Sequence, residues 1–323
     1  MILVVGIDGY SYDWRHWLEE DGFHTGLLDS PHALSGPGWT SIFTGLTAEG
    51  HGIPHVPKPG MLKGLKRPPY VWDHLGAVDM ETVAVNVPFT YPPRLVRRLL
   101  VCGYPAPETD RTFPRKAAAD WAWRDLDLYY AHQGEPSWDF LACPDEELME
   151  TCRASRWSLS HHFLLELQKG KPDLAILCLT DLDRLAHYAY RTFRQKRVLK
   201  GIVADMRLLL ARLEFTLYPD WIFVVSDHAL DLTDAPREED GWGLCHGPHY
   251  PHTRRGIIAY KGPHALPVEG LSAAVEDVTP TLLYLLDAAP SQRIEGTALT
   301  QIAEGGQVDE GEIKRQLEGL GYV

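Results

Sequence analysis

Aspartates follow three strongly apolar segments of the chain, and their positions indicate a shared site. The three acids are Asp8, Asp183 and Asp227, and Asp181 competes with Asp183 for the second position. Segments that are apolar at successive positions are typical of buried parallel strands, whose carboxyl ends meet at one edge of a sheet and form its ligand sites. Three carboxylates brought together there would repel one another, so we expect a bound cation to neutralise them.

Histidines accompany the same acids. The candidates are the pairs Asp183 with His187 and Asp227 with His228, followed by His246, His249 and His252. A spacing of four residues brings Asp183 and His187 onto one face of a helical turn. His246, His249 and His252 lie close together in the sequence, so any one of them could be the ligand. A single histidine among 15 carries little weight, but the joint pattern predicts a metal centre. Mixed aspartate and histidine ligation suits zinc, with manganese or another transition metal as the alternative.

A serine stands where a helix is expected to begin. Ser35 is followed by Pro37, which a first helical turn tolerates. Two interpretations follow, because Ser35 either caps the helix with its side chain or acts as a nucleophile. The second interpretation, a nucleophile, is supported by the backbone amides at a helix start, which attract a phosphoryl group. It also gains from a neighbouring metal ion, which lowers the pKa of the hydroxyl.

The motifs around these residues resemble those of the alkaline phosphatase superfamily. They are Asp8-Gly9, Ser35-x-Pro-x-x-Thr-Ser-x-x-Thr-Gly, His51-Gly52-Ile53, the segment 85–93, Asp183-x-x-x-His187, Ser226-Asp227-His228, His252-x-x-x-Gly256 and Asp277-Val278-Thr279-Pro280-Thr281. The resemblance is strongest to the type I phosphodiesterase and nucleotide pyrophosphatase branch. It extends in order over nearly the whole chain and is weakest between residues 94 and 164.

The resemblance implies a two-metal hydrolase in which Ser35 forms a covalent phospho-enzyme intermediate. It assigns one divalent ion, expected to be zinc or alternatively manganese, to Asp8, Ser35, Asp227 and His228, and the other to Asp183, His187 and His252. Asn86 is implied as a substrate contact. Trp39 stands where sulfatases carry the arginine of their maturation motif, which argues against a formylglycine sulfatase.

The expected activity is that of a phosphodiesterase or nucleotide pyrophosphatase acting on a small phosphorylated substrate such as a nucleotide. Two alternatives stay open: a phosphomonoesterase or phosphomutase of the same superfamily, and a non-catalytic protein that binds metal or phosphate. Of the basic residues near the ligand motifs, Arg184 is the candidate for a phosphate contact. A monoester dianion is stabilised by additional cationic contacts, so the small number of such candidates favours diesters as substrates.

The elements that must position this site alternate between strands and helices. Strands are expected at 2–7, 82–87, 174–179, 221–225 and 256–260, and helices at 40–45, 146–168, 194–214 and 275–286. Such alternation predicts an α/β fold with a doubly wound, mostly parallel sheet flanked by helices, as in the alkaline phosphatase superfamily. We expect a single domain over residues 1–323, with a small insertion or cap at about 94–145.

Composition narrows the class of partner. The chain carries 31 basic and 44 acidic residues, a net charge of -13, which argues against a broad nucleic-acid-binding surface. Five cysteines without a CxxC pair predict free thiols in a reducing compartment. The apolar segment at 2–7 is too short for a signal peptide or a membrane span, so we expect a soluble cytoplasmic protein. The sequence leaves the oligomeric state undetermined.

Overall fold

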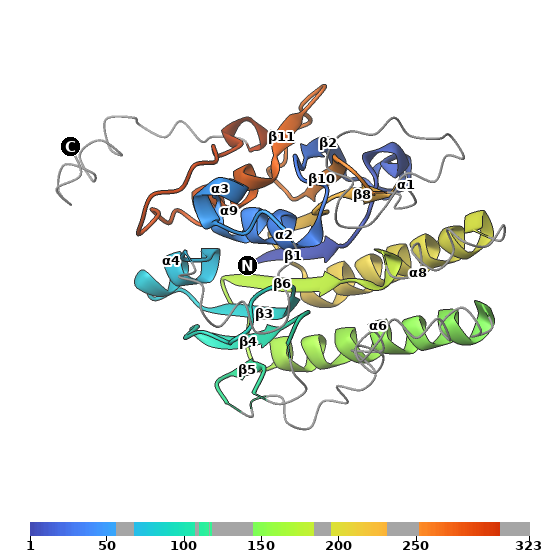
Figure 1. Ribbon diagram of the computed structural model, residues 1–323, viewed down its shortest axis with the longest axis horizontal. Helices are drawn as coiled ribbons and strands as arrows, with labels where there is room; N and C mark the ends of the chain where they lie inside the picture. Colours follow the sequence, from blue (N-terminus) through green and yellow to red (C-terminus); the bar gives the residue numbers. More distant parts are fainter. Residues whose placement is uncertain are drawn as a thin grey trace.

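The apolar segments of the sequence come together as the centre of one large sheet. The computed structural model describes residues 1–55, 68–106, 110–115, 117, 145–183, 195–230 and 252–303. Within these residues nine strands form a sheet in the order β11-β2-β10-β7-β1-β6-β3-β4-β5 (Figure 1). Their bounds, in that order, are Ser272–Ala274, His24–Asp29, Arg255–Lys261, Trp221–Val225, Ile2–Ile7, Leu174–Leu179, Thr82–Val87, Arg98–Cys102 and Thr112–Phe113. A separate pair joins β8 (Ala229–Leu230) to β9 (His252–Thr253).

The four central strands are parallel, as their apolar composition predicts. Ile2 of β1 is in register with Leu174 of β6 on one side and with Trp221 of β7 on the other. The strand expected at 256–260 is present as β10, but it runs antiparallel to β7 and β2. The reason lies in the connection. Since β9 leads into β10 and pairs with β8, which follows β7, the chain enters β10 at the edge where β7 ends and must run back.

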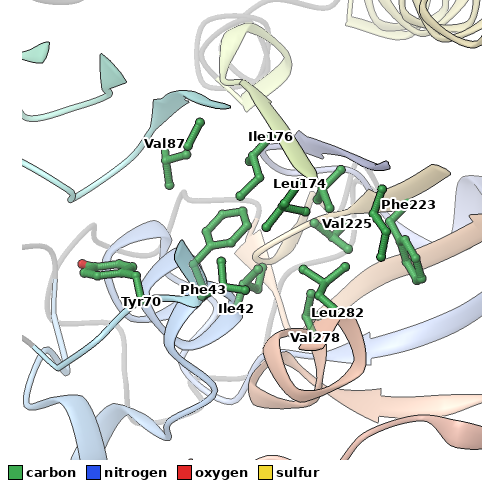
Figure 2. Close-up of a cluster of buried hydrophobic side chains, with 14 of the residues drawn as sticks. Ile42, Phe43, Tyr70, Val87, Leu174, Ile176, Phe223, Val225, Val278 and Leu282 are labelled. Carbon is green, nitrogen blue, oxygen red and sulfur yellow. The ribbon is translucent and has the colours of Figure 1, made fainter. Parts of the chain in front are cut away.

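Helices cover both faces of the sheet and divide its side chains into two cores. The helices are α1 (His16–Glu20), α2 (Ser35–Thr44), α3 (Ala48–His51), α4 (Val71–Ala77), α6 (Asp145–Gln168), α8 (Gln195–Leu217) and α9 (Val278–Leu285). Alternate residues of β1 point to opposite faces. Leu3 and Val5 pack in the core that α6 and α8 cover, where the two long helices run side by side (Figure 1). Ile2 and Val4 pack in the opposite core, to which α2, α4 and α9 also contribute side chains. Figure 2 shows other members of this core, among them Phe43 of α2, Ile176 of β6 and Leu282 of α9.

The helix that carries the serine motif, α2, spans Ser35–Thr44. Its start agrees with the helix start expected at Ser35 but precedes the helical segment expected at 40–45. Gly36 and Gly38 are poor helix formers, but every residue from Gly36 to Thr44 is buried, and tertiary packing stabilises the first turn. The other three predicted helices agree more closely. Those expected at 146–168 and 194–214 are α6 and α8, and the one at 275–286 is a 3-10 turn, Val275–Asp277, followed by α9.

Several elements were absent from the sequence-based prediction. These are β2, β4, β5 and β11, together with the short helices α1, α3 and α4. Strands β4 and β5 fall within the range 94–145, so these parts of the expected insertion belong to the sheet. Residues 118–144 lie outside the described residues, and a cap there stays a prediction.

None of the helices in the described ranges combines the length and apolarity that crossing a membrane requires.

Candidate active site

The carboxyl ends of three central strands bring the predicted acids to one edge of the sheet. Asp8 directly follows β1, and its backbone N–H donates to the carbonyl of Leu179 at the end of β6 (2.9 Å). Asp183 lies just beyond that same strand, and Asp227 lies just beyond β7. All three are at most 9% exposed. The three carboxylates therefore lie at the same edge of the sheet.

Asp227 is the most deeply buried of the three. It is 0% exposed, and neither carboxylate oxygen accepts a hydrogen bond from any part of the chain that the structure describes. Burial, and then the nearby charge of Asp8, raise its pKa well above the ordinary value. A buried carboxylate without donors is costly, and a bound cation supplies the missing partner.

His228 stands between the acids and the serine. Its Nε2 lies 3.3 Å from Asp8 Oδ1, 3.4 Å from Asp227 Oδ2 and 3.2 Å from Ser35 Oγ. Burial lowers its pKa, but the surrounding carboxylates outweigh that effect and raise the pKa to about 10. In the metal-free chain the protonated ring is thus the counter-charge of the cluster, in the position that a metal ion would take.

A second group of ligand atoms adjoins the first. His252 Nε2 lies 3.1 Å from Asp183 Oδ1, while His252 Nδ1 lies 3.2 Å from the Ala33 carbonyl. Both partners only accept, so each contact needs a proton on its ring nitrogen, and a metal ion at this site would replace the proton on Nε2 while Nδ1 donates to Ala33. The rings of His252 and His228 stack at 4.0 Å, so the two groups form one continuous centre.

Two triads have ligand atoms that all lie within 4.8 Å of one another. One is Asp8, Asp227 and His228, and the other is Asp183, His228 and His252. His228 thus reaches both groups, whereas the family resemblance assigned it to the first alone. The donor set of carboxylates and imidazoles fits a divalent transition metal.

Ser35 is the first residue of α2 and points toward the acids. Leu34 occupies the N-cap position, and no side chain caps the helix. The Ser35 hydroxyl instead donates to Asp8 Oδ1 at 3.4 Å and lies beside His228 Nε2. The interpretation of Ser35 as an N-cap is therefore wrong, because its side chain is directed into the centre.

Trp39 fixes Asp8 from the same helix, and sequence reasoning missed this contact. Its indole Nε1 donates to Asp8 Oδ2 at 3.2 Å, and the ring is 0% exposed. A Cβ at Gly6 would lie 2.6 Å from the Trp39 ring, so a glycine in β1 makes room for it. Trp39 and Ser35 thus hold the two oxygens of one carboxylate.

The remaining predicted residues have different outcomes. His187, Arg184, His246 and His249 lie outside the described residues, so their roles stay predictions. Asp181 does not join the cluster of ligand atoms, because its carboxylate pairs with Arg156. Asn86 adopts a φ of 58° at a register shift of β3, and its Nδ2 donates to the Cys178 carbonyl at 2.9 Å. This bond links β3 to β6, so part of the Asn86 side chain is engaged within the sheet.

Comparison with known proteins finds solved structures of similar fold. A scan of protein-family models gives no match, and neither does a search of curated proteins. Among solved structures, murine ectonucleotide pyrophosphatase/phosphodiesterase 5 is similar, with a TM-score of 0.58 and 11% identity over 92% of this chain and 97% of that one. A phosphonate monoester hydrolase from Silicibacter pomeroyi has a TM-score of 0.55 and 15% identity over 94% and 77% of the two chains. A 2-O GAG sulfatase has a TM-score of 0.54 and 10% identity over 92% and 73%.

These proteins are hydrolases of the alkaline phosphatase superfamily, and this chain has the α/β fold that they share.

Proposed function

We propose that the chain is a metal-dependent phosphoric ester hydrolase of the phosphodiesterase or nucleotide pyrophosphatase type, with Ser35 as its nucleophile. The observation that carries the proposal is the position of the Ser35 hydroxyl. It stands at the start of a helix within reach of Asp8 and His228, and His228 Nε2 in turn lies 3.4 Å from the buried carboxylate of Asp227. A structural serine would not need these neighbours.

The residues present fit two divalent metal ions, zinc in the first instance and manganese as the alternative. One site would be formed by Asp8, Ser35, Asp227 and His228, and the other by Asp183, His252 and the predicted ligand His187. Such ions lower the pKa of a bound hydroxyl and stabilise charge on phosphoryl oxygens. The unsatisfied oxygens of Asp227 support this assignment, because a cation is the partner they lack.

The chain itself supplies the nucleophile and the groups that orient it. Ser35 Oγ would form a bond to phosphorus as the bond to the leaving alcohol or phosphate breaks, and water would then release the phosphoryl group from Ser35. The first amide in the α2 ladder is that of Gly38, which donates to the Leu34 carbonyl (2.9 Å). Amides before it lie at the positive end of the helix and are suited to a phosphoryl oxygen.

Diesters and nucleotide-type pyrophosphate bonds are the proposed substrates. Within the described ranges, no hydrogen bond or ion pair joins an arginine or lysine to Ser35, Asp8 or Asp227. A monoester dianion would reward such a contact. Murine ectonucleotide pyrophosphatase/phosphodiesterase 5 has a structure, in an inactive form, in complex with AMP. That complex supports a nucleotide-like ligand. The buried free thiol of Cys178 supports a reducing, cytoplasmic compartment.

The proposal is tested by removing the hydroxyl. Ser35→Ala should lower kcat/KM for an aryl methyl phosphodiester by several orders of magnitude, since loss of a nucleophile leaves little catalysis. Acid-quenched wild-type protein should carry a phosphoryl group on the peptide that contains Ser35. An aryl monoester and an aryl sulfate, assayed with the same added zinc or manganese, should both be poorer substrates.

Thr40→Ala is the matched control. The Thr40 hydroxyl donates to the Gly36 carbonyl within α2 (2.7 Å) and is 1% exposed, so it does not face the centre. This variant should keep its activity and lose only about 1 kcal/mol of stability. An active Ser35→Ala protein together with an inactive Thr40→Ala protein would show that the nucleophile has been misplaced. A clear preference for the monoester would instead move the assignment to a phosphomonoesterase.

A further inference from the structure

A buried arginine reaches the strand end that carries Asp183, and the proposed mechanism does not use it. Arg156 lies on α6, is 4% exposed, and donates from Nε (2.8 Å) and Nη2 (2.5 Å) to Asp181 Oδ2. Asp181 is 8% exposed and stands two residues before Asp183. Both residues belong to the helical turn 181–183 that follows β6.

The pairing is one-sided. Both donors of Arg156 converge on a single oxygen, and Asp181 Oδ1 accepts no hydrogen bond from the described residues. A buried carboxylate two residues from a candidate metal ligand is itself a competent ligand. By holding Oδ2 with two donors, the arginine neutralises the Asp181 carboxylate and ties it to α6.

The arginine is held in place from a third element. Its Nη1 lies 3.6 Å from Asp205 Oδ2 on α8, and Arg153 Nε donates to the same oxygen at 2.8 Å. A chain of charged side chains therefore runs from Asp205 on α8 through Arg156 on α6 to Asp181, which follows β6. This arrangement aims Asp181 at α6, while Asp183 Oδ1 lies 3.1 Å from His252 Nε2.

We propose that Arg156 is a positioning residue that holds Asp181 out of the metal centre, so that Asp183 is the carboxylate presented beside His252. The inference rests on the proposed function, because it requires a divalent metal at Asp183. It also gives a physical reason for the choice between two neighbouring aspartates that the sequence left open. The arginine selects between them by neutralising one.

The test measures metal binding rather than turnover. Zinc affinity is determined by competition with a chromogenic chelator, bound equivalents by elemental analysis, and stability by thermal unfolding. Arg156→Met should weaken affinity about 10-fold or more, as loss of residues that support ligands does. Arg156→Lys, which keeps the charge but not the two-pronged contact, should lose less affinity than Arg156→Met. Asp181→Asn should keep both equivalents of metal, because Asp181 is not a ligand.

A double variant keeps the test decisive if Arg156→Met does not fold. Breaking a buried pair by removing one partner is strongly destabilising, whereas removing both charges is far milder. Arg156→Met/Asp181→Asn should therefore fold, bind two equivalents of zinc and regain affinity to within about threefold of the wild type. Loss of metal in this double variant, or in an Asp181→Asn protein whose thermal unfolding shows that it is folded, would overturn the proposal, because it would make Asp181 a ligand.

A second ion pair of α6 serves as the control for stability. Arg98 donates to Glu166 Oε1 at 3.3 Å, and both side chains are 13% exposed. Arg98→Met should lower the unfolding temperature without changing zinc affinity. If it weakens zinc binding as much as Arg156→Met does, or if Arg156→Met leaves the affinity unchanged, the positioning role is refuted. A wild-type protein that binds no divalent metal would instead overturn the metal centre itself.

Discussion

Replacing Asp227 by asparagine should stabilise the metal-free protein while removing its ability to gain stability from metal. The carboxylate is fully buried and lacks hydrogen-bond donors among the described residues. An unsatisfied buried polar group costs about 1–3 kcal/mol, and more when it is charged. Asparagine has nearly the same shape, carries no charge and brings a donor that can face Asp8. The same substitution removes an anionic ligand.

The size of the effect on the unfolding temperature follows from the chain length. With about 2.1 cal/mol/K of unfolding entropy per residue, 323 residues give roughly 0.7 kcal/mol/K. A relief of about 1–3 kcal/mol then raises Tm by about 1.5–4 °C in the presence of a chelator. For wild-type protein, metal at about 1,000 times its Kd contributes about 4.1 kcal/mol, or about 6 °C. Asp227→Asn should therefore be the more stable protein without metal and the less stable one with it.

The dependence on pH has a definite sign. Because burial and Asp8 raise the pKa of Asp227 in the folded state, its ionised form destabilises the fold, and this penalty grows as pH rises above the unfolded pKa of about 3.9. The stabilisation by Asp227→Asn should accordingly be larger at pH 8 than at pH 5. Differential scanning calorimetry in a chelator and in zinc measures both comparisons.

A paired aspartate provides the control for this experiment. Asp29 accepts hydrogen bonds from Arg254 Nε (3.0 Å) and Nη2 (2.5 Å), and its side chain is 39% exposed. Asp29→Asn should change stability by at most about 1 kcal/mol and leave the response to metal intact. The reasoning is refuted if Asp227→Asn is less stable than wild type in the chelator, or if metal raises both melting temperatures equally.

Three further substitutions test the surroundings of the site. A Cβ on Gly38 would lie 2.7 Å from the backbone oxygen of Asp227, so Gly38→Ala should lower kcat/KM about 10- to 100-fold at saturating metal. Trp39→Phe removes the donor to Asp8 Oδ2 and should weaken zinc affinity about 10- to 100-fold in chelator competition. Burial lowers the pKa of His74 to about 4. Its neutral form therefore stabilises the fold above pH 6.5, and about 2 kcal/mol is lost between pH 7.5 and pH 5. Urea unfolding of His74→Asn should lack that part of the pH dependence.

The bounds of the central strands were predictable because burial on both faces of the sheet requires a continuous run of apolar residues. Strands β1, β3, β6 and β7 have the bounds expected from their apolar segments, since a strand covered on both faces has apolar residues at successive positions. Strand β2 lacks such a continuous apolar run, because half-buried residues such as His24 and Asp29 alternate with buried ones. Strand β4 is apolar, but it follows a segment rich in proline and arginine, which led to its assignment to an insertion.

The convergence of the acids was also predictable, but the contacts that orient them were not. Strand-end aspartates reach one edge of a parallel sheet whatever the details of packing. The bond from Trp39 to Asp8 and the pairing of Arg156 with Asp181 join residues from different elements. Such contacts depend on how a helix is rotated and placed on the sheet. No local spacing encodes that placement.

The start of α2 shows why local rules fail where the site is built. Helix propensity disfavours Gly36, Pro37 and Gly38, and on that basis the helix should begin at about residue 40. The structure begins it at Ser35 because a close approach is needed, and a Cβ on Gly38 would meet the Asp227 backbone. A better helix former at this position would hold the serine away from the acids. The sequence gives up helix stability at the place where the hydroxyl must reach the carboxylates, and this conflict between propensity and position is itself a sign of function.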